Sequence, residues 1–147
     1  MNMNTTERQY EAYVYSVREQ MEQHLAALDE LSLKQSKRPL TFIDRNSVER
    51  SLQIVTEIAI GCSKHYLKSR NRPVPSEARA AIERVYEMTG LTEPEIGIMR
   101  GAIGMRNAIV HDYLNLDWAR IDPVLAERKY HKVAEYATVI SKELLST

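Results

Sequence analysis

The stretch GMRNAIVHDYLNLD, residues 104–117, places five polar or charged side chains within eight positions of an otherwise apolar, helix-like segment. Asn107 and His111 are four residues apart, so they share one face of a helix. Arg106 and Tyr113 are seven apart and share another face if the helix continues that far. Arg106 and His111 differ by about 140° around an ideal helix, so they cannot lie side by side but can flank a cleft.

These residue types suit phosphodiester chemistry. The Arg106 guanidinium offers a planar fork of donors that matches a phosphate. His111 can transfer protons near neutral pH and could promote attack by a 2′-hydroxyl while Arg106 stabilises the developing charge. Asn107 could orient a ring or a ribose, and Tyr113 offers a hydroxyl or a stacking face. A purely structural alternative also exists, because Arg and His near a helix C-terminus stabilise its last carbonyls and a following Tyr can anchor a core.

Composition predicts a soluble globular chain of one domain, residues 1–147. Hydrophobic residues make up 44% and charged residues 27%, and twenty basic side chains balance twenty acidic ones. Net charge therefore indicates neither a nucleic-acid nor a membrane partner, and any anion site must be local. The lone Cys62 excludes an intramolecular disulfide and a cysteine metal cluster. No long apolar run and no signal peptide are present, which predicts a cytoplasmic protein.

Apolar residues recur at spacings of three and four along most of the chain, which predicts helices nearly everywhere. The first helix covers roughly residues 5–33, and the second runs to about Arg70. A short third helix ends at Gly90, and a fifth runs to about Leu145. The expected start signals are Asp44 or Asn46 for the second helix, Ser76 for the third, a capping box of Thr92 and Glu95 for the fourth, and Asp117 or Asp122 for the fifth.

The predicted fold is an all-α bundle of four main helices plus a short one, with antiparallel neighbours because the connections are short. The fourth helix is apolar on two sides. One side carries Ile96, Met99 and Ile103, and the other carries Ile98, Met105 and Ile109. A helix that is apolar on several sides is either central or lies at a subunit interface, so we expect a homodimer.

The segment RNAIVHDY, residues 106–113, resembles the signature of the HEPN superfamily: Arg-Asn, three residues, His, one residue, Tyr. Within it the chain resembles the HepT-like toxins, which are encoded beside a small MNT-type nucleotidyltransferase antitoxin. RSLQIVTEIAI at 50–60 is similar to the family's second helix, and VPSEARAAIERVYEMTGL at 74–91 is similar to its short helix. Gly104 also fits, whereas the first helix matches only in pattern and the Asp122-Pro123 step departs from the family.

The resemblance implies an all-α HEPN homodimer in which two Arg–His pairs line one cleft near the two-fold axis. It implies a metal-independent endoribonuclease toxin of a type VII-like toxin–antitoxin system, acting on tRNA or mRNA without a cofactor. Arg106 and His111 carry over as catalytic residues, and Asn107 carries over as a residue that supports them. Tyr113 carries over as the acceptor of AMP that the antitoxin transfers from ATP. The added phosphate is then expected to lie by Arg106 in the substrate's place.

The sequence alone leaves two alternatives to a ribonuclease. The chain could be a catalytically silent HEPN partner that binds a nucleotide, a nucleic acid or the transferase, or a structural bundle without a site. The basic run KSRNR places Lys68, Arg70 and Arg72 beside a turn, where they form either a solvated helix end or an extension of an RNA track.

The remaining candidates have structural interpretations. Glu57 is expected to be an inter-helix partner rather than a base, and Cys62 a small core residue. Trp118 either covers the cleft or packs in the dimer. The histidines outside the motif have no metal-ligand spacing and are expected to be surface or half-buried residues; they are His24, His65 and His131.

Overall fold

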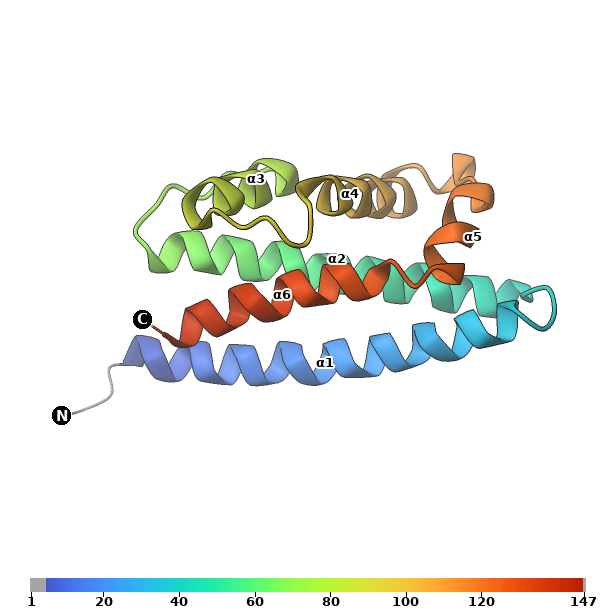
Figure 1. The fold of residues 1–147 in the computed structure, drawn as a ribbon, viewed down its shortest axis with the longest axis horizontal. Helices are drawn as coiled ribbons and strands as arrows, with labels where there is room; N and C mark the ends of the chain where they lie inside the picture. The colour runs from blue at the N-terminus through green and yellow to red at the C-terminus, as the bar shows by residue number, and fades with distance from the viewer. Residues whose placement is uncertain (1–4, 147) are drawn as a thin grey trace.

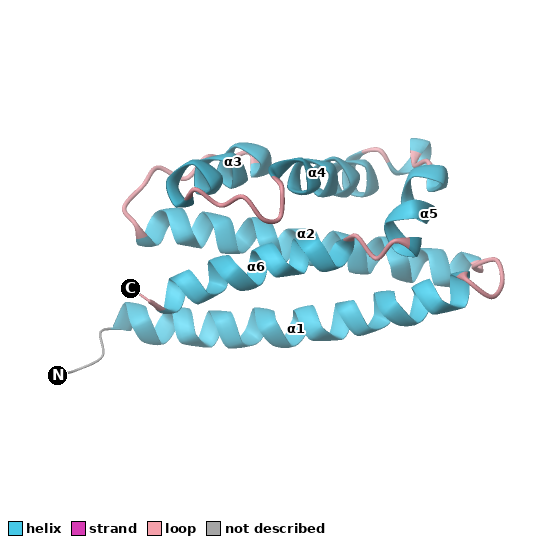
Figure 2. Cartoon of the chain, viewed as in Figure 1, coloured by secondary structure: helices cyan, strands magenta, loops and turns pink. Residues whose placement is uncertain are grey.

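Helices make up almost the whole of residues 5–146, the part of the chain that this computed structural model describes. The elements in chain order are α1 (Thr5–Gln35), α2 (Phe42–Ser69), α3 (Ala78–Thr89), α4 (Ile96–His111), the short 3-10 turn η1 (Tyr113–Asn115), α5 (Trp118–Ala126) and α6 (Tyr130–Leu145). Figure 2 shows helices and loops only, and residues 5–146 contain no strand. The all-α prediction is therefore confirmed, with six helices in this range rather than the expected five.

The helix α2 is the centre of the molecule (Figure 1). It runs beside α1 and α6 along the long axis, while α3 and α4 follow one another along a further side of α2, and α5 lies across one end. The core fills the space where these helices meet. Its fully buried members include Leu28, Val48, Val55, Ala59, Tyr136 and Ile140. None of the helices in residues 5–146 has both the length and the apolar content needed to span a bilayer.

The helix starts differ from the predicted ones because the capping residue lies slightly earlier or later than expected. Thr41, rather than Asp44 or Asn46, caps α2. Its hydroxyl accepts a hydrogen bond from the Asp44 amide at 3.1 Å, and the Asp44 carboxylate accepts one from the Thr41 amide at 3.0 Å. Asp44 is therefore the third residue of a capping box, which satisfies two amides at once.

The starts of α3 and α4 have no side-chain cap. Glu77 precedes α3, so the Ser76 prediction is wrong, and Glu95 precedes α4 without the predicted Thr92 capping box. The end of α3 is as predicted. Gly90 adopts a left-handed conformation with φ of 67°, which glycine reaches without strain, and its amide donates to Tyr86.

The predicted fifth helix is two helices. Asp117 caps α5 by accepting a hydrogen bond from the Ala119 amide, so Asp117 is the correct one of the two predicted starts. Asp122 and Pro123 both lie within α5. The chain breaks at Arg128, which has a φ of 54°. A left-handed residue cannot continue an α-helix, so α6 starts afresh at Tyr130.

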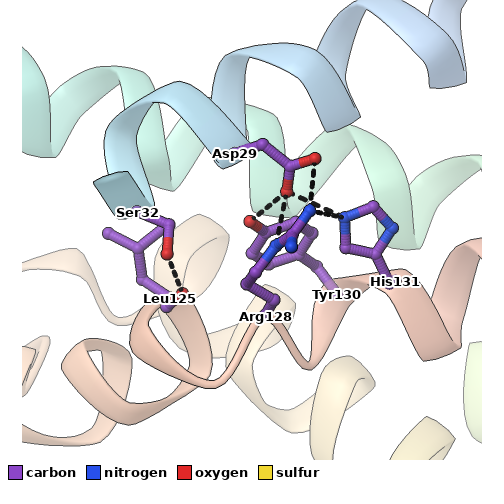
Figure 3. A network of polar contacts seen from close by, with 6 residues as sticks. All are labelled: Asp29, Ser32, Leu125, Arg128, Tyr130 and His131. Carbon is purple, nitrogen blue, oxygen red and sulfur yellow. Dashed lines mark hydrogen bonds and ion pairs between the residues drawn. The ribbon is translucent and has the colours of Figure 1, made fainter. Parts of the chain in front are cut away.

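A network on Asp29 of α1 holds this break in place (Figure 3). The Asp29 carboxylate accepts hydrogen bonds from Arg128 Nε at 3.0 Å, Tyr130 Oη at 2.7 Å and His131 Nε2 at 2.8 Å. Burial by itself raises the pKa of Asp29, but the three hydrogen bonds outweigh it and lower that pKa to about 2. The junction of α5 and α6 is therefore fastened to α1 by a carboxylate that stays ionised.

Replacing Asp29 with Asn should destabilise the protein at pH 7 by about 1–2 kcal/mol, since charged hydrogen bonds contribute somewhat more than neutral ones and Asp29 is partly exposed. The folded-state pKa of about 2 lies below the ordinary 3.8. The stabilisation is therefore present above pH 4 and is lost as the pH falls towards 2. Urea unfolding at pH 7 and at pH 3 measures this. A difference between wild type and Asp29→Asn that is equal at both pH values would contradict it, and exposed Asp122→Asn is the control.

Candidate functional site

Arg106 lies on the side of α4 that faces α2. Its Nε is 3.4 Å from Oε1 of Glu57 on α2, which confirms Glu57 as an inter-helix partner. The Arg106 side chain is only 16% exposed, and its Nε has no solvent contact and no well-directed hydrogen bond. In residues 10–146 the Arg106 Nη atoms form no hydrogen bond, so the outer edge of the guanidinium keeps its donors for a ligand.

Asn107 and His111 lie on a different side of α4, and both are exposed. Their spacing of four residues places them on one face, as predicted. His111 is the last residue of α4, with Asp112 as its C-cap. Arg106 and His111 therefore point away from each other within one protomer, in agreement with the angle expected from the sequence.

Tyr113 follows the end of α4 and lies in the turn η1. It is 50% exposed, and its hydroxyl donates to Oδ1 of Asn46 on α2 at 3.4 Å. This exposure argues against Tyr113 as a core anchor. Because α4 ends at His111, the expected shared helix face of Arg106 and Tyr113 does not form. Asn46 and Glu57 are eleven residues apart on α2, so the Tyr113 hydroxyl and Arg106 are separated by about 16 Å along that helix.

A groove of 680 Å³ opens beside Arg106. It is bounded by α2, α4 and the junction of α5 and α6. Its apolar lining includes Leu52, Val55, Ile98, Ala102, Val124 and Val133. Its charged lining comprises Arg106, Glu95, Glu127, Arg128, Lys129 and Lys132, together with the titratable His131. Sequence reasoning treated His131 alone and missed this cluster, although the run ERKYHK at 127–132 was a visible signal.

The open side of α4 is a ridge of three glycines, Gly97, Gly101 and Gly104. A Cβ atom added at any of them would meet nothing within 4 Å. Met99, Ile103 and Ile109 are buried inside the protomer, whereas Ile98 and Met105 beside the ridge are only partly covered. A second hollow of 430 Å³ flanks the ridge on the side of η1. The second apolar side predicted for α4 is thus available to a neighbour.

The structure places Lys68, Arg70 and Arg72 at the other end of α2 from Tyr113. Asn46 and Arg70 are separated by 24 residues, or about 36 Å along a helix. Arg70 is engaged, because its guanidinium lies 4.8 Å from the Tyr66 ring centre and pairs with Glu143 at 3.6 Å. These three residues therefore do not join the motif within one protomer.

Trp118 packs on α2 inside the protomer. Its Nε1 donates to Oε2 of Glu49 at 2.7 Å, and Arg45 lies 4.9 Å from its ring centre. The two expected roles, the cover of a cleft and a packing element of a dimer, both stay predictions, because this contact lies within one protomer. Its effect is to fix the segment after η1 against the first turns of α2.

The two other histidines and the cysteine that the sequence singled out contact other side chains of the protein. His24 contacts the Ser51 hydroxyl at 2.9 Å, and His65 lies against the rings of Tyr10 and Tyr13. Burial, followed by a nearby cation, lowers the pKa of both histidines. Cys62 is buried, and burial raises its pKa to about 11, as suits an unreactive core thiol. In residues 5–146 no three His, Cys, Asp or Glu side chains are grouped so that they could hold a metal ion.

Comparison with known proteins identifies the family and the fold of the chain. The family model described as "Ribonuclease HepT-like" matches residues 19–143. A crystal structure described as a toxin–antitoxin with AMP-PNP has a chain with the same fold, with a TM-score of 0.72 and 18% identity over 94% of this chain and 99% of that chain. A search of the curated proteins finds no significant match. The family model covers most of the chain, including α4 and its motif, so the protein belongs to the HepT-like ribonuclease family.

Proposed function

We propose that this protein is a metal-independent endoribonuclease toxin. The observation that carries the proposal is the set of contacts that Arg106 makes and leaves unmade. Its buried Nε lies beside Glu57, while its outer donors are unused and border a groove. Buried polar groups are normally hydrogen-bonded, so the unpartnered buried Nε, together with the unused outer donors, favours a ligand-binding role over a purely helix-linking one. Membership of the HepT-like ribonuclease family supports RNA as the substrate.

The proposed chemistry is attack of a ribose 2′-hydroxyl on the adjacent phosphorus. His111 accepts the 2′-hydroxyl proton, and the 2′-oxygen forms a bond to phosphorus. The bond to the 5′-oxygen of the next nucleotide breaks, and that oxygen takes a proton from water. Arg106 stabilises the charge that develops on the phosphoryl oxygens. Asn107, on the same face as His111, orients the ribose or the ring. The products are a 2′,3′-cyclic phosphate and a 5′-hydroxyl.

A homodimer resolves the divergence of Arg106 and His111 within one chain. Two copies related by a two-fold axis perpendicular to α4, close to its C-terminal end, would place His111 of one copy level with Arg106 of the other. The glycine ridge of Gly97, Gly101 and Gly104 allows the two α4 backbones to approach closely. Partly covered Ile98 and Met105 beside the ridge would then be buried, which adds apolar area to the contact.

The proposed partner is an MNT-type nucleotidyltransferase antitoxin that transfers AMP to Tyr113 in the cytoplasm. The half-exposed position of Tyr113, just past the end of α4, supports this role. The chain of similar fold comes from a structure described as a toxin–antitoxin with AMP-PNP, which suits such a partner.

The test is RNA cleavage by the purified protein in excess EDTA, combined with light scattering. Wild type should be dimeric at micromolar concentration and should cleave RNA without added metal. Gly101→Gln should keep its helicity, because a Cβ atom at Gly101 meets nothing within 4 Å in the protomer, but should be monomeric and at least tenfold slower. Gly101→Ala is the matched control with a minimal side chain. Cleavage that stops in EDTA and returns with Mg²⁺, or a fully active monomer, would overturn the proposal.

A further inference from the structure

The junction of α5 and α6 carries a dense basic cluster. Arg128, Lys129, His131 and Lys132 occur within five positions, and we refer to these four residues as the basic elbow. All four line the same groove as Arg106, although they come from a different part of the chain. The protein as a whole has a net charge of zero, but cations outnumber carboxylates in the lining of this groove, with Arg106, Arg128, Lys129 and Lys132 against Glu95 and Glu127.

The basic elbow has a fixed part and an exchangeable part. Arg128 and His131 are committed to Asp29, with Arg128 Nη2 2.7 Å from its Oδ2, as Figure 3 shows. Lys129 pairs only with Glu127 at 3.0 Å, and its side chain is 55% exposed. Lys132 pairs with Glu135 at 3.5 Å and is 50% exposed. Exposed ion pairs of this kind contribute little, so either ammonium can exchange its carboxylate for a phosphate.

We infer that the basic elbow binds the RNA backbone and leads the strand to Arg106, with Lys129 and Lys132 as the phosphate contacts. The inference rests on the proposed function and adds the path of the substrate to it. The Asp29 network keeps the backbone of the elbow fixed, so the two lysines are presented from a rigid support. The apolar lining on the α5–α6 side of the groove, from Val124 and Val133, suits the faces of unpaired bases.

The shape of the groove favours single-stranded RNA over a duplex. Its lining is mostly apolar, with cations at the α6 side and Arg106 on the α4 side. Bases can rest on apolar side chains while phosphates meet the lysines, and this requires unstacked, single-stranded nucleotides. A duplex offers chiefly its phosphates and 2′-hydroxyls and would leave the apolar lining unused. Glu127 and Glu95 also line the groove. Lys129 pairs with Glu127 in the free protein and would exchange that carboxylate for a phosphate of the RNA.

The experiment measures binding of a fluorescent single-stranded RNA at several salt concentrations. His111→Ala is the parent, so that the RNA stays intact. Removing two phosphate contacts on single-stranded nucleic acid should reduce the slope of log K against log salt by about 1.4. We expect this loss for the double variant Lys129→Gln, Lys132→Gln. The matched control is Lys68→Gln, Arg72→Gln, which removes two exposed charges at the far end of α2 and should leave the slope unchanged.

The outcomes separate the path of the RNA from the function itself. An unchanged slope for the elbow variant, with a loss for the Lys68 and Arg72 variant, would overturn the inference while the proposed function stands. A parent without salt-dependent RNA binding would overturn both. A shift of the elbow variant to monomer in light scattering would identify the groove as a protein contact instead. Unchanged helicity and an unchanged dimer, together with the reduced slope, are the expected result.

Discussion

Arg106→Ala and His111→Ala should each lower the rate of RNA cleavage by about 10²–10⁴-fold. The magnitude follows from the loss of a general base or of a charge that stabilises the transition state. Both proteins should remain folded. His111 is exposed, so its loss should change stability by less than about 0.5 kcal/mol. Arg106→Ala leaves Glu57 unpaired, but Glu57 is 43% exposed and can be solvated.

The assay follows cleavage of a labelled RNA in EDTA, with circular dichroism and thermal melting on the same samples. Arg100→Ala is a matched control, since Arg100 lies on the same helix, is 43% exposed and pairs with Glu83. It should retain cleavage. If the Arg106 and His111 variants both unfold, these residues serve mainly to stabilise the end of α4, and the catalytic assignment fails.

A mixture of the two inactive variants distinguishes how the site is assembled. Arg106 and His111 lie on different sides of α4, so the productive pair should come from two chains. A heterodimer of Arg106→Ala with His111→Ala retains one intact pair across the interface. Mixing the variants after partial unfolding and refolding should therefore restore a fraction of the activity. No recovery, despite heterodimers seen by mass spectrometry, would place both residues of a working pair in one chain.

The helices were predictable because their signal is local. A stripe of apolar residues at spacings of three and four identifies α1 and α2, and residues such as Val14, Leu28 and Val55 are indeed buried. The positions of Asn107 and His111 on one face, and of Arg106 on another, follow from helix geometry alone. The order of the motif residues also carried the resemblance to the family.

The features that the sequence did not reveal depend on contacts between distant segments. The break between α5 and α6 requires Arg128 in a left-handed conformation, and Asp29, 99 residues earlier, is what binds Arg128 there. The groove beside Arg106 exists because that break turns the basic elbow towards α4. The start of α2 was predicted wrongly for a more local reason. Thr41 and Asp44 are both residue types that cap helices, and only the reciprocal hydrogen bonds between them show that Thr41 is the cap.

Incubation with a cognate nucleotidyltransferase, ATP and Mg²⁺ should add AMP to Tyr113. The Tyr113 oxygen would attack the α-phosphorus of ATP and release pyrophosphate. Tyr113 is suited to this, because the residue is half-exposed and its hydroxyl makes a long hydrogen bond of 3.4 Å to Asn46. Mass spectrometry should show steps of one AMP that map to the peptide containing Tyr113. Tyr113→Phe should abolish this gain.

Tyr15 provides the control for simple exposure. It is 72% exposed on α1, so Tyr15→Phe should leave the modification unchanged if the transferase recognises the end of α4 rather than any accessible tyrosine. AMP found on Tyr66 or Tyr130, which are buried in the protomer, would refute the assignment to Tyr113.

Modification of Tyr113 should also abolish RNA cleavage, and the structure indicates how. Within one protomer the Tyr113 hydroxyl is about 16 Å along α2 from Arg106, so the added phosphate cannot reach that arginine directly. It lies instead two residues from His111, where its charge and bulk would exclude the RNA backbone, and it can approach Arg106 only across the proposed dimer interface. RNA cleavage after incubation with the transferase and ATP tests this: wild type should lose activity, whereas Tyr113→Phe, which cannot accept AMP, should keep it. A modified wild type that cleaves at the unmodified rate would contradict this account.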